Sequence, residues 1–144
     1  MSQRLDGKVA IVTGSGQGVG RGIILAFAAE GAHCVVADFN EETGQQVVRE
    51  AEALGTKASF VRCDVTKRTS VDATVAHAVD TFGGIDVLVN NAAILDVSPI
   101  AELDVAKARD ILDVNLIGPM IGTRAVLGDM QAAGGGSIVN VGSI

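Results

Sequence analysis

Residues 13–20, near the N-terminus, place glycines at the spacing of a phosphate-binding loop. Gly14, Gly18 and Gly20 lack the Cβ atoms that would keep a pyrophosphate away from the backbone. An apolar strand is expected before this loop and a helix after it. The first N–H groups of that helix and its positive dipole end would therefore point at the phosphates. We also expect Ser15, Gln17 and Val19 of this loop to contact the bound nucleotide.

A carboxylate ends the second predicted strand. Asp38 follows Gly20 by 18 residues, where a dinucleotide fold places an acceptor for the adenosine ribose hydroxyls. Its negative charge would repel a 2′-phosphate, and neither Gln17 nor Phe39 supplies a compensating positive charge. The pattern favours NAD over NADP, with Asp38 and Phe39 beside the cofactor. In the structural alternative, the glycines make only a tight turn and Asp38 caps the next helix.

Two further strand ends carry polar side chains. Asp64 ends the third predicted strand, where its carboxylate could accept from an adenine amine or cap the helix that begins near Lys67. Asn91 ends the fourth strand, and the small residues Ala92 and Ala93 after it let a cofactor pass close by. Because Asn is also an ordinary residue at strand ends, both positions keep a purely structural alternative.

The elements that must position these residues alternate strictly between strand and helix. Short, β-branched apolar runs predict strands over residues 9–12, 34–37, 59–62, 87–89 and 137–141, and apolar residues at helical spacing lie between them. Short connections between such elements require right-handed crossovers. The sequence thus predicts one α/β domain over residues 1–144, a doubly wound parallel sheet of the Rossmann type that binds ligands at the carboxyl ends of its strands.

Composition narrows the classes of partner. The net charge is −6, and no basic cluster is larger than Lys67-Arg68, so a nucleic-acid partner is not expected. No apolar run approaches the roughly 20 residues that cross a bilayer. Without a membrane span or a signal peptide, the expected compartment is the cytoplasm. Cys34 and Cys63 would lie about 13 Å apart on neighbouring strands, too far for a disulfide. No metal site is expected.

The motifs together resemble the short-chain dehydrogenase/reductase family over the whole chain. They are Thr13-Gly14-x-x-x-Gly18-x-Gly20, Asp64-Val65, Asn90-Asn91-Ala92, Asn115 and the run Ser-Ile-Val-Asn-Val-Gly-Ser at 137–143. Ala93 stands where the family usually has Gly, and Gly142 where a first Ser is common. The resemblance implies an NAD(P)-dependent oxidoreductase that interconverts a small-molecule alcohol and a ketone by hydride transfer. It also implies a homo-oligomer, a dimer or tetramer.

The resemblance also implies roles for individual residues. Val65 would contact the adenine and Asn91 the nicotinamide-side ribose. Ser143 matches the residue that holds the substrate oxygen. Asn115 matches the residue whose main-chain carbonyl binds a water of the proton relay, and Pro119, which has no N–H, would leave that carbonyl without its helical donor.

The acid/base of the family is a Tyr followed four residues later by a Lys, both beyond the catalytic Ser. The chain contains no Tyr and ends one residue after Ser143. We therefore expect a Rossmann domain truncated before the Tyr-x-x-x-Lys segment, able to bind the cofactor and inactive alone. The alternatives are a non-catalytic nucleotide-binding module, a truncated regulatory subunit, and a methyltransferase on a related sheet.

Overall fold

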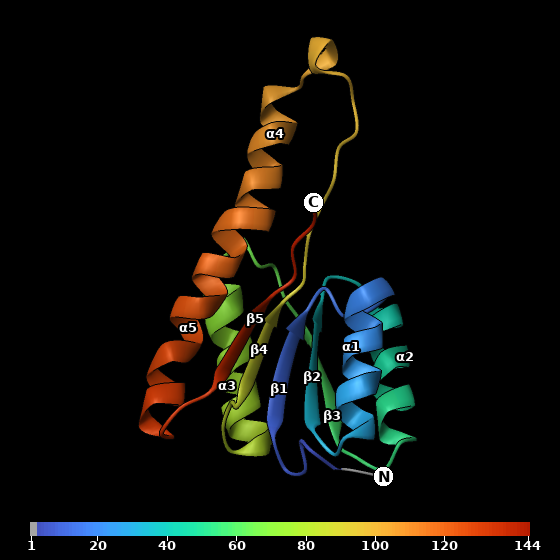
Figure 1. Ribbon diagram of the computed structural model, residues 1–144, viewed down its shortest axis with the longest axis vertical. Coiled ribbons are helices and arrows are strands. Elements are labelled where there is room, and N and C mark those ends of the chain that lie inside the picture. Colours follow the sequence, from blue (N-terminus) through green and yellow to red (C-terminus); the bar gives the residue numbers. More distant parts are fainter. Residues whose placement is uncertain (1–2) are drawn as a thin grey trace.

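The computed structural model describes residues 3–144 and shows a parallel sheet with helices on both faces (Figure 1). Its strands are β1 (Val9–Thr13), β2 (His33–Asp38), β3 (Ala58–Arg62), β4 (Val87–Asn90) and β5 (Ser137–Asn140). Each lies within one residue, at either end, of the strand predicted from the sequence. The predicted doubly wound parallel sheet is therefore confirmed.

The strands lie in the order β3-β2-β1-β4-β5. The chain moves outward from β1 in one direction through β2 and β3, and in the other through β4 and β5. Within β1, Val12 pairs with Val36 of β2 and with Val89 of β4. The connections after β1 and β4 leave the sheet toward opposite faces, so a crevice opens where these strands end.

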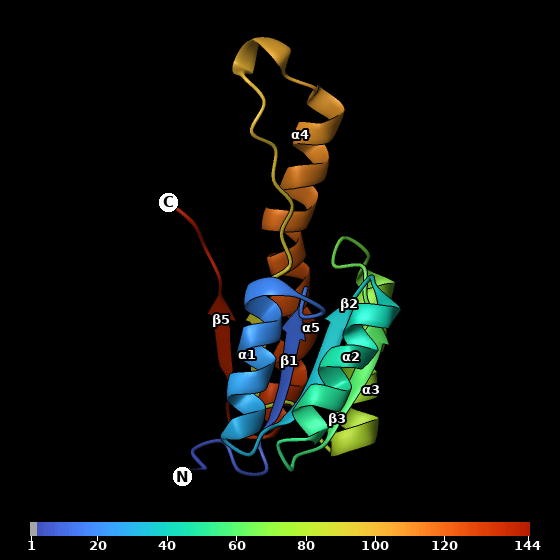
Figure 2. The ribbon, with the colours of Figure 1, turned by 90° about the vertical axis from the view of Figure 1, so that its right-hand side faces the viewer.

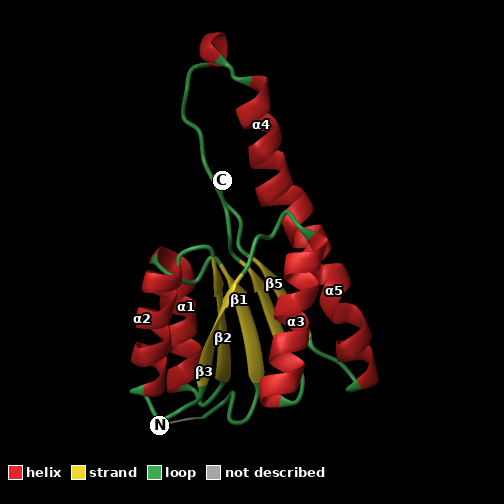
Figure 3. Cartoon of the chain, turned by 180° about the vertical axis from the view of Figure 1, so that it is seen from behind, coloured by secondary structure: helices red, strands yellow, loops and turns green. Residues whose placement is uncertain are grey.

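Two helices cover each face of the sheet. Helices α1 (Gly18–Ala29) and α2 (Glu41–Glu52) lie on one face, and α3 (Arg68–Phe82) and α5 (Gly118–Ala132) on the other (Figures 1 and 3). Strand residues alternate between two apolar cores. Val12 packs in the core under α1 and α2, whereas Ile11 packs in the core under α3 and α5.

Helix α5 is preceded by a second helix, α4 (Val105–Leu112), which projects beyond the sheet. Figure 2 shows α4 and the connection that precedes it, with the short 3-10 helix Ile100–Glu102, extending past the carboxyl ends of the strands. A single wide turn, Asp113–Ile117, joins α4 to α5, and in it the Gly118 N–H donates to Asp113 O. Because Pro119 has no N–H, the regular helical ladder cannot run through this point.

The helix over Val105–Ala132 is long and apolar enough, by length and composition alone, to cross a membrane. The sequence shows no uninterrupted apolar run there because Asp113, Arg124 and Asp129 divide it. Core helices of soluble proteins pass the same test when they are mostly buried; here Val126 and Met130 are buried in the core under α3 and α5, but most of the segment is not buried. That the chain does not cross a membrane stays a prediction.

Both thiols are free and buried. Burial raises the pKa of Cys34, on β2, to about 12. Burial likewise raises the pKa of Cys63, which follows β3. The thiolate form of each is disfavoured because the low-dielectric core does not solvate its charge.

The raised pKa of Cys34 predicts a loss of stability in alkali. The unfolded thiol ionises near pH 9 and the folded one near pH 12, so between these values the unfolded chain binds fewer protons than the folded one. The unfolding free energy should therefore fall by up to about 1.4 kcal/mol per pH unit above pH 9. In Cys34→Ser, which has no titrating thiol, urea unfolding at pH 8 to 10.5 should show a shallower slope; equal slopes would contradict the burial argument.

Candidate functional site

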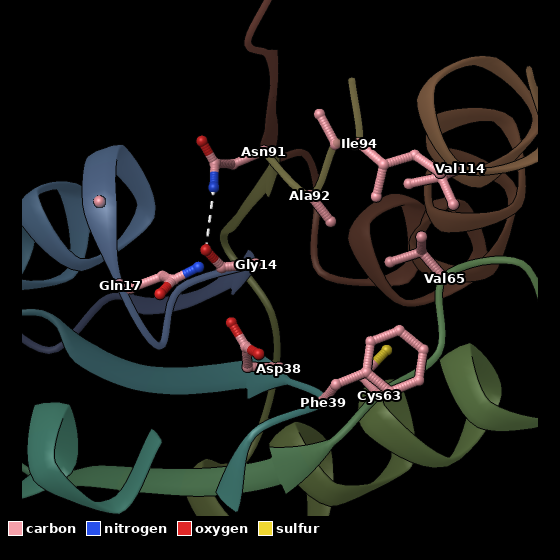
Figure 4. A pocket seen from close by; sticks show the side chains of 12 residues that line it. Gly14, Gln17, Asp38, Phe39, Cys63, Val65, Asn91, Ala92, Ile94 and Val114 are labelled. Atoms are coloured by element: carbon pink, nitrogen blue, oxygen red, sulfur yellow. Dashed lines mark hydrogen bonds between the residues drawn. The ribbon is translucent and has the colours of Figure 1, made fainter. Parts of the chain in front are cut away.

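A cleft of about 320 Å³ lies at the carboxyl ends of the central strands (Figure 4). Nine of the residues predicted to bind a cofactor line it: Gly14, Gln17, Gly18, Asp38, Phe39, Val65, Asn91, Ala92 and Ala93. Cys63, Ile94 and Val114 complete the wall. Residues from five separate segments of the chain thus converge on one cavity.

The glycine loop approaches the neighbouring strand end too closely for side chains. Gly14 has a φ of +63°, and a Cβ there would lie 2.7 Å from the Cα of Ala92. A Cβ on Gly20 would overlap the carbonyl oxygen of Gly14. A Cβ on Gly18 would meet nothing within 4 Å. Gly14 and Gly20 are therefore required by packing within the protein, while Gly18 leaves the cleft side of the loop open.

The N-terminus of α1 suits an anion. Its first residue is Gly18, and the residue before it, Gln17, has extended backbone and makes no capping hydrogen bond with its side chain. Within the described chain, the first turn of α1 carries no acidic residue. Its first N–H groups and dipole end therefore face the cleft without a side-chain acceptor, an arrangement that fits a pyrophosphate.

A hydrogen-bond network fixes the loop against the end of β4. The Asn91 Nδ2 donates to the carbonyl oxygens of Thr13 (3.0 Å) and Gly14 (3.1 Å). In return, the buried Thr13 Oγ1 accepts from the N–H groups of Asn91 (3.0 Å) and Ala92 (3.1 Å). The side-chain oxygen of Asn91 points away from the loop (Figure 4). Asn91 thus shapes the cleft in addition to lining it.

The Asp38 carboxylate stands at the edge of the cleft with both oxygens oriented by backbone. Its Oδ2 accepts from the Gly16 N–H (2.8 Å) and its Oδ1 from the Asn40 N–H (3.0 Å). Helix α2 is capped by Asn40, whose Oδ1 accepts from the Thr43 N–H. Asp38 is therefore not the helix cap of the structural alternative. Each oxygen keeps a lone pair for a further donor, such as a ribose hydroxyl.

Asp64 lies outside the cleft. Its Oδ1 accepts from the N–H (3.0 Å) and the hydroxyl (2.7 Å) of Thr66, and its Oδ2 lies 3.8 Å from the Lys67 ammonium. It therefore forms a turn just before α3 and does not cap that helix itself. Its neighbours Cys63 and Val65 face the cleft instead.

Three other predicted contacts also lie away from the cleft lining. Ser15 is fully buried, and its hydroxyl donates to Val12 O at 2.6 Å. Gly20 is buried against the loop, whereas Val19 is exposed on the surface of α1. Neither Ser15 nor Gly20 therefore presents a side chain to the cleft.

Asn115 links the wide helical turn to the connection after β4. Its Oδ1 accepts from the Ile94 N–H (2.9 Å), and its Nδ2 donates to Ile94 O (2.8 Å). These two bonds hold Ile94 in the cleft wall. They use only the side-chain amide of Asn115, so its main-chain carbonyl takes no part in them. Pro119, four residues later, cannot donate to that carbonyl.

Ser143 is not brought to the cleft. Its hydroxyl donates to Ile144 O at 3.5 Å, beyond the end of β5. Asn115 lines a second, open groove of about 530 Å³, which also includes Asn140 and Val141. Asn115 thus lines the groove and bonds to Ile94 of the cleft wall, whereas Ser143 lines neither the cleft nor the groove.

Several residues of the site were not predicted from the sequence. Gly16 lies inside the motif, but only the fold shows that its N–H holds Asp38. Cys63 could have been found from its position beside Val65 at a strand end. Ile94 and Val114 carry no sequence signal, because apolar residues in a loop and on a helix reach the cleft only through the tertiary fold.

The fold, the uncapped helix N-terminus and the oriented carboxylate define an α/β domain of the Rossmann type with a cleft that suits a dinucleotide. The chain belongs to the short-chain dehydrogenase family, whose sequence profile matches residues 8–144. This membership removes the methyltransferase alternative.

Individual relatives agree with the family. The chain is 45% identical over 144 residues to a 3-alpha-(or 20-beta)-hydroxysteroid dehydrogenase of Mycobacterium tuberculosis, covering all of this chain and 54% of that protein. It is 43% identical over 141 residues to galactitol 2-dehydrogenase of Agrobacterium fabrum, covering 97% and 54%. The chain therefore spans about half the length of the curated relatives it matches.

Solved structures show the same fold. A short-chain type dehydrogenase/reductase from Mycobacterium marinum matches with a TM-score of 0.93 and 33% identity, covering 99% of this chain and 60% of that one. An NAD⁺-bound xylitol dehydrogenase matches with a TM-score of 0.93 and 32% identity, covering 97% and 54%. Both matches confirm the Rossmann-type architecture.

The network between Thr13 and the end of β4 predicts a specific loss of stability. Thr13→Val keeps the side-chain shape but leaves two backbone N–H groups without their acceptor, which should lower the unfolding free energy by about 2 kcal/mol. Thr13→Ser keeps the oxygen and removes only a methyl group, so urea unfolding should place it closer to the wild type. A Thr13→Ser variant less stable than Thr13→Val would show that the methyl, not the oxygen, matters.

Proposed function

We propose that the protein is the cofactor-binding part of an NAD-dependent oxidoreductase that interconverts a small-molecule alcohol and a ketone. The observation that carries this proposal is the Asp38 carboxylate, held by the Gly16 and Asn40 N–H groups beside the glycine loop. Its remaining lone pairs suit the two adenosine ribose hydroxyls of NAD. A 2′-phosphate at that place would meet its negative charge.

The other cleft residues fit the remaining parts of the cofactor. The pyrophosphate would be bound by the N-terminus of α1 at Gly18, the adenine by Val65 and the nicotinamide-side ribose by Asn91 and its neighbours. When bound, the cofactor supplies the hydride acceptor of the reaction. The protein supplies orientation and a wall that excludes water from one side.

The charges near the loop support NAD over NADP. Arg21, one turn into α1, forms an ion pair with Glu50 of α2 (2.7 Å). The pairing neutralises the arginine that follows the loop in sequence. A 2′-phosphate would therefore meet Asp38 without a free guanidinium from Arg21 to offset the repulsion.

Catalysis is proposed for a longer protein than these residues. Ser143 would hold the substrate oxygen, and the Asn115 carbonyl would hold a water of the proton path. The chain contains no Tyr, so we propose that residues 1–144 bind NAD but do not turn it over. The names of the relatives, hydroxysteroid and galactitol dehydrogenases, support an alcohol as the substrate class. A homo-oligomer is proposed from the family resemblance alone.

The proposal predicts that Asp38 sets cofactor preference. In Asp38→Ala, the affinity for NADH should fall about tenfold because hydrogen bonds from two hydroxyls to a charged acceptor are lost. The affinity for NADPH should be unchanged or higher. Because the chain has neither Trp nor Tyr, binding can be followed through the emission of the reduced cofactor itself.

Asp129→Ala provides the matched control, since it removes the same charge from an exposed position of α5. It should leave both affinities unchanged. In the same samples, NAD with a panel of secondary alcohols should yield no NADH. Equal losses for NADH and NADPH in Asp38→Ala would contradict the assigned role of Asp38, and NADH production by the wild-type chain would contradict the proposed inactivity.

A further inference from the structure

Gly16 joins the glycine loop to the end of β2 and the start of α2. It is buried, and its N–H donates to Asp38 Oδ2 at 2.8 Å. The N–H of Asn40 donates to the other oxygen of the same carboxylate at 3.0 Å. One donor on each oxygen fixes both the position and the plane of the carboxylate before any ligand binds.

A side chain at position 16 would disturb this arrangement. A Cβ on Gly16 would lie 2.8 Å from Thr43 Oγ1 and 3.0 Å from both Cγ and Oδ2 of Asp38. The backbone of Gly16 has an ordinary negative or extended φ, since it is absent from the positive-φ glycines. Steric contact with Asp38 and Thr43, and not backbone strain, is therefore what excludes a larger residue.

Thr43, the other neighbour, stands at the start of α2. Its N–H donates to Asn40 Oδ1 at 3.1 Å and its hydroxyl to Asn40 O at 3.4 Å, both part of the cap of α2. The Cβ would also lie 3.0 Å from Asp38 Cγ and Oδ2. It would therefore push on the carboxylate itself and lengthen its bond to the Gly16 N–H, which turns the carboxylate away from its fixed orientation.

We infer that Gly16 is a positioning residue for cofactor choice: its N–H and its missing side chain hold the Asp38 carboxylate in the orientation that accepts both adenosine ribose hydroxyls. This inference rests on the proposed function. The effect is selective, because only a cofactor with a free 2′-hydroxyl depends on that orientation. A cofactor with a 2′-phosphate loses nothing when the carboxylate turns away.

The test is Gly16→Ala, assayed by titration with NADH and with NADPH. The ratio of the NADPH Kd to the NADH Kd should fall about tenfold, with most of the change in the NADH value. Gly22→Ala is the matched control, because a Cβ on this exposed residue of α1 would meet nothing within 4 Å. Its ratio should equal that of the wild type.

A second variant guards against a folding defect. Gly16→Ala with Thr43→Ala removes the oxygen that the new Cβ would approach most closely, and its ratio should lie between those of the wild type and Gly16→Ala. A double variant of Gly16→Ala and Asp38→Ala should show no further fall beyond Asp38→Ala alone, because both act through one carboxylate.

The possible results distinguish a failure of the proposed function from a failure of the role assigned to Gly16. A wild-type chain that binds neither cofactor would overturn the proposed function, and this inference with it. A wild-type chain that prefers NADH, with Gly16→Ala weakening both cofactors equally or neither, would overturn only the role of Gly16. A loss in Gly16→Ala that adds fully to that in Asp38→Ala would do the same.

Discussion

The close approach of the backbone at Gly14 to Ala92 is the constraint on which the site depends. It brings the carboxyl ends of β1 and β4 together at the place where the chain leaves the sheet toward opposite faces. The reciprocal bonds between Thr13 and Asn91 hold that contact. Without it, the glycine loop, the N-terminus of α1 and the wall that follows β4 would not enclose one cleft. The absence of a side chain at Gly14 is thus explained by packing within the protein.

The sheet could be predicted from the sequence because each strand is a short apolar run, and because apolar residues recur at helical spacing between the strands. The crossover rule then determines the parallel, doubly wound order. The same rules place the wall of the cleft at strand ends, which is why the sequence predicts that Asp38 and Asn91 lie there. Local rules suffice for these two residues because the carboxyl ends of parallel strands meet at one edge, whereas Val65 was predicted only from the family resemblance.

Contacts between distant segments could not be predicted in this way. Residue type alone does not show that the Ser15 hydroxyl bonds to Val12 O, or that Asp64 turns toward Thr66. The projecting helix α4 and the paired bond of Asn115 to Ile94 depend on how α5 docks on the sheet. Gly16 is the clearest case, since its N–H donates to the carboxylate of Asp38, 22 positions later in the chain.

The central claim is that the cleft between the glycine loop and the end of β2 is a site for NAD. The most direct measurement is the change in backbone amide NMR shifts when NAD is added to the ¹⁵N-labelled chain. The account predicts saturable shifts centred on Gly14, Gly16, Gly18 and Asp38, with those of α5 unchanged. Shifts confined to the α4 and α5 side, or none at millimolar NAD, would contradict it.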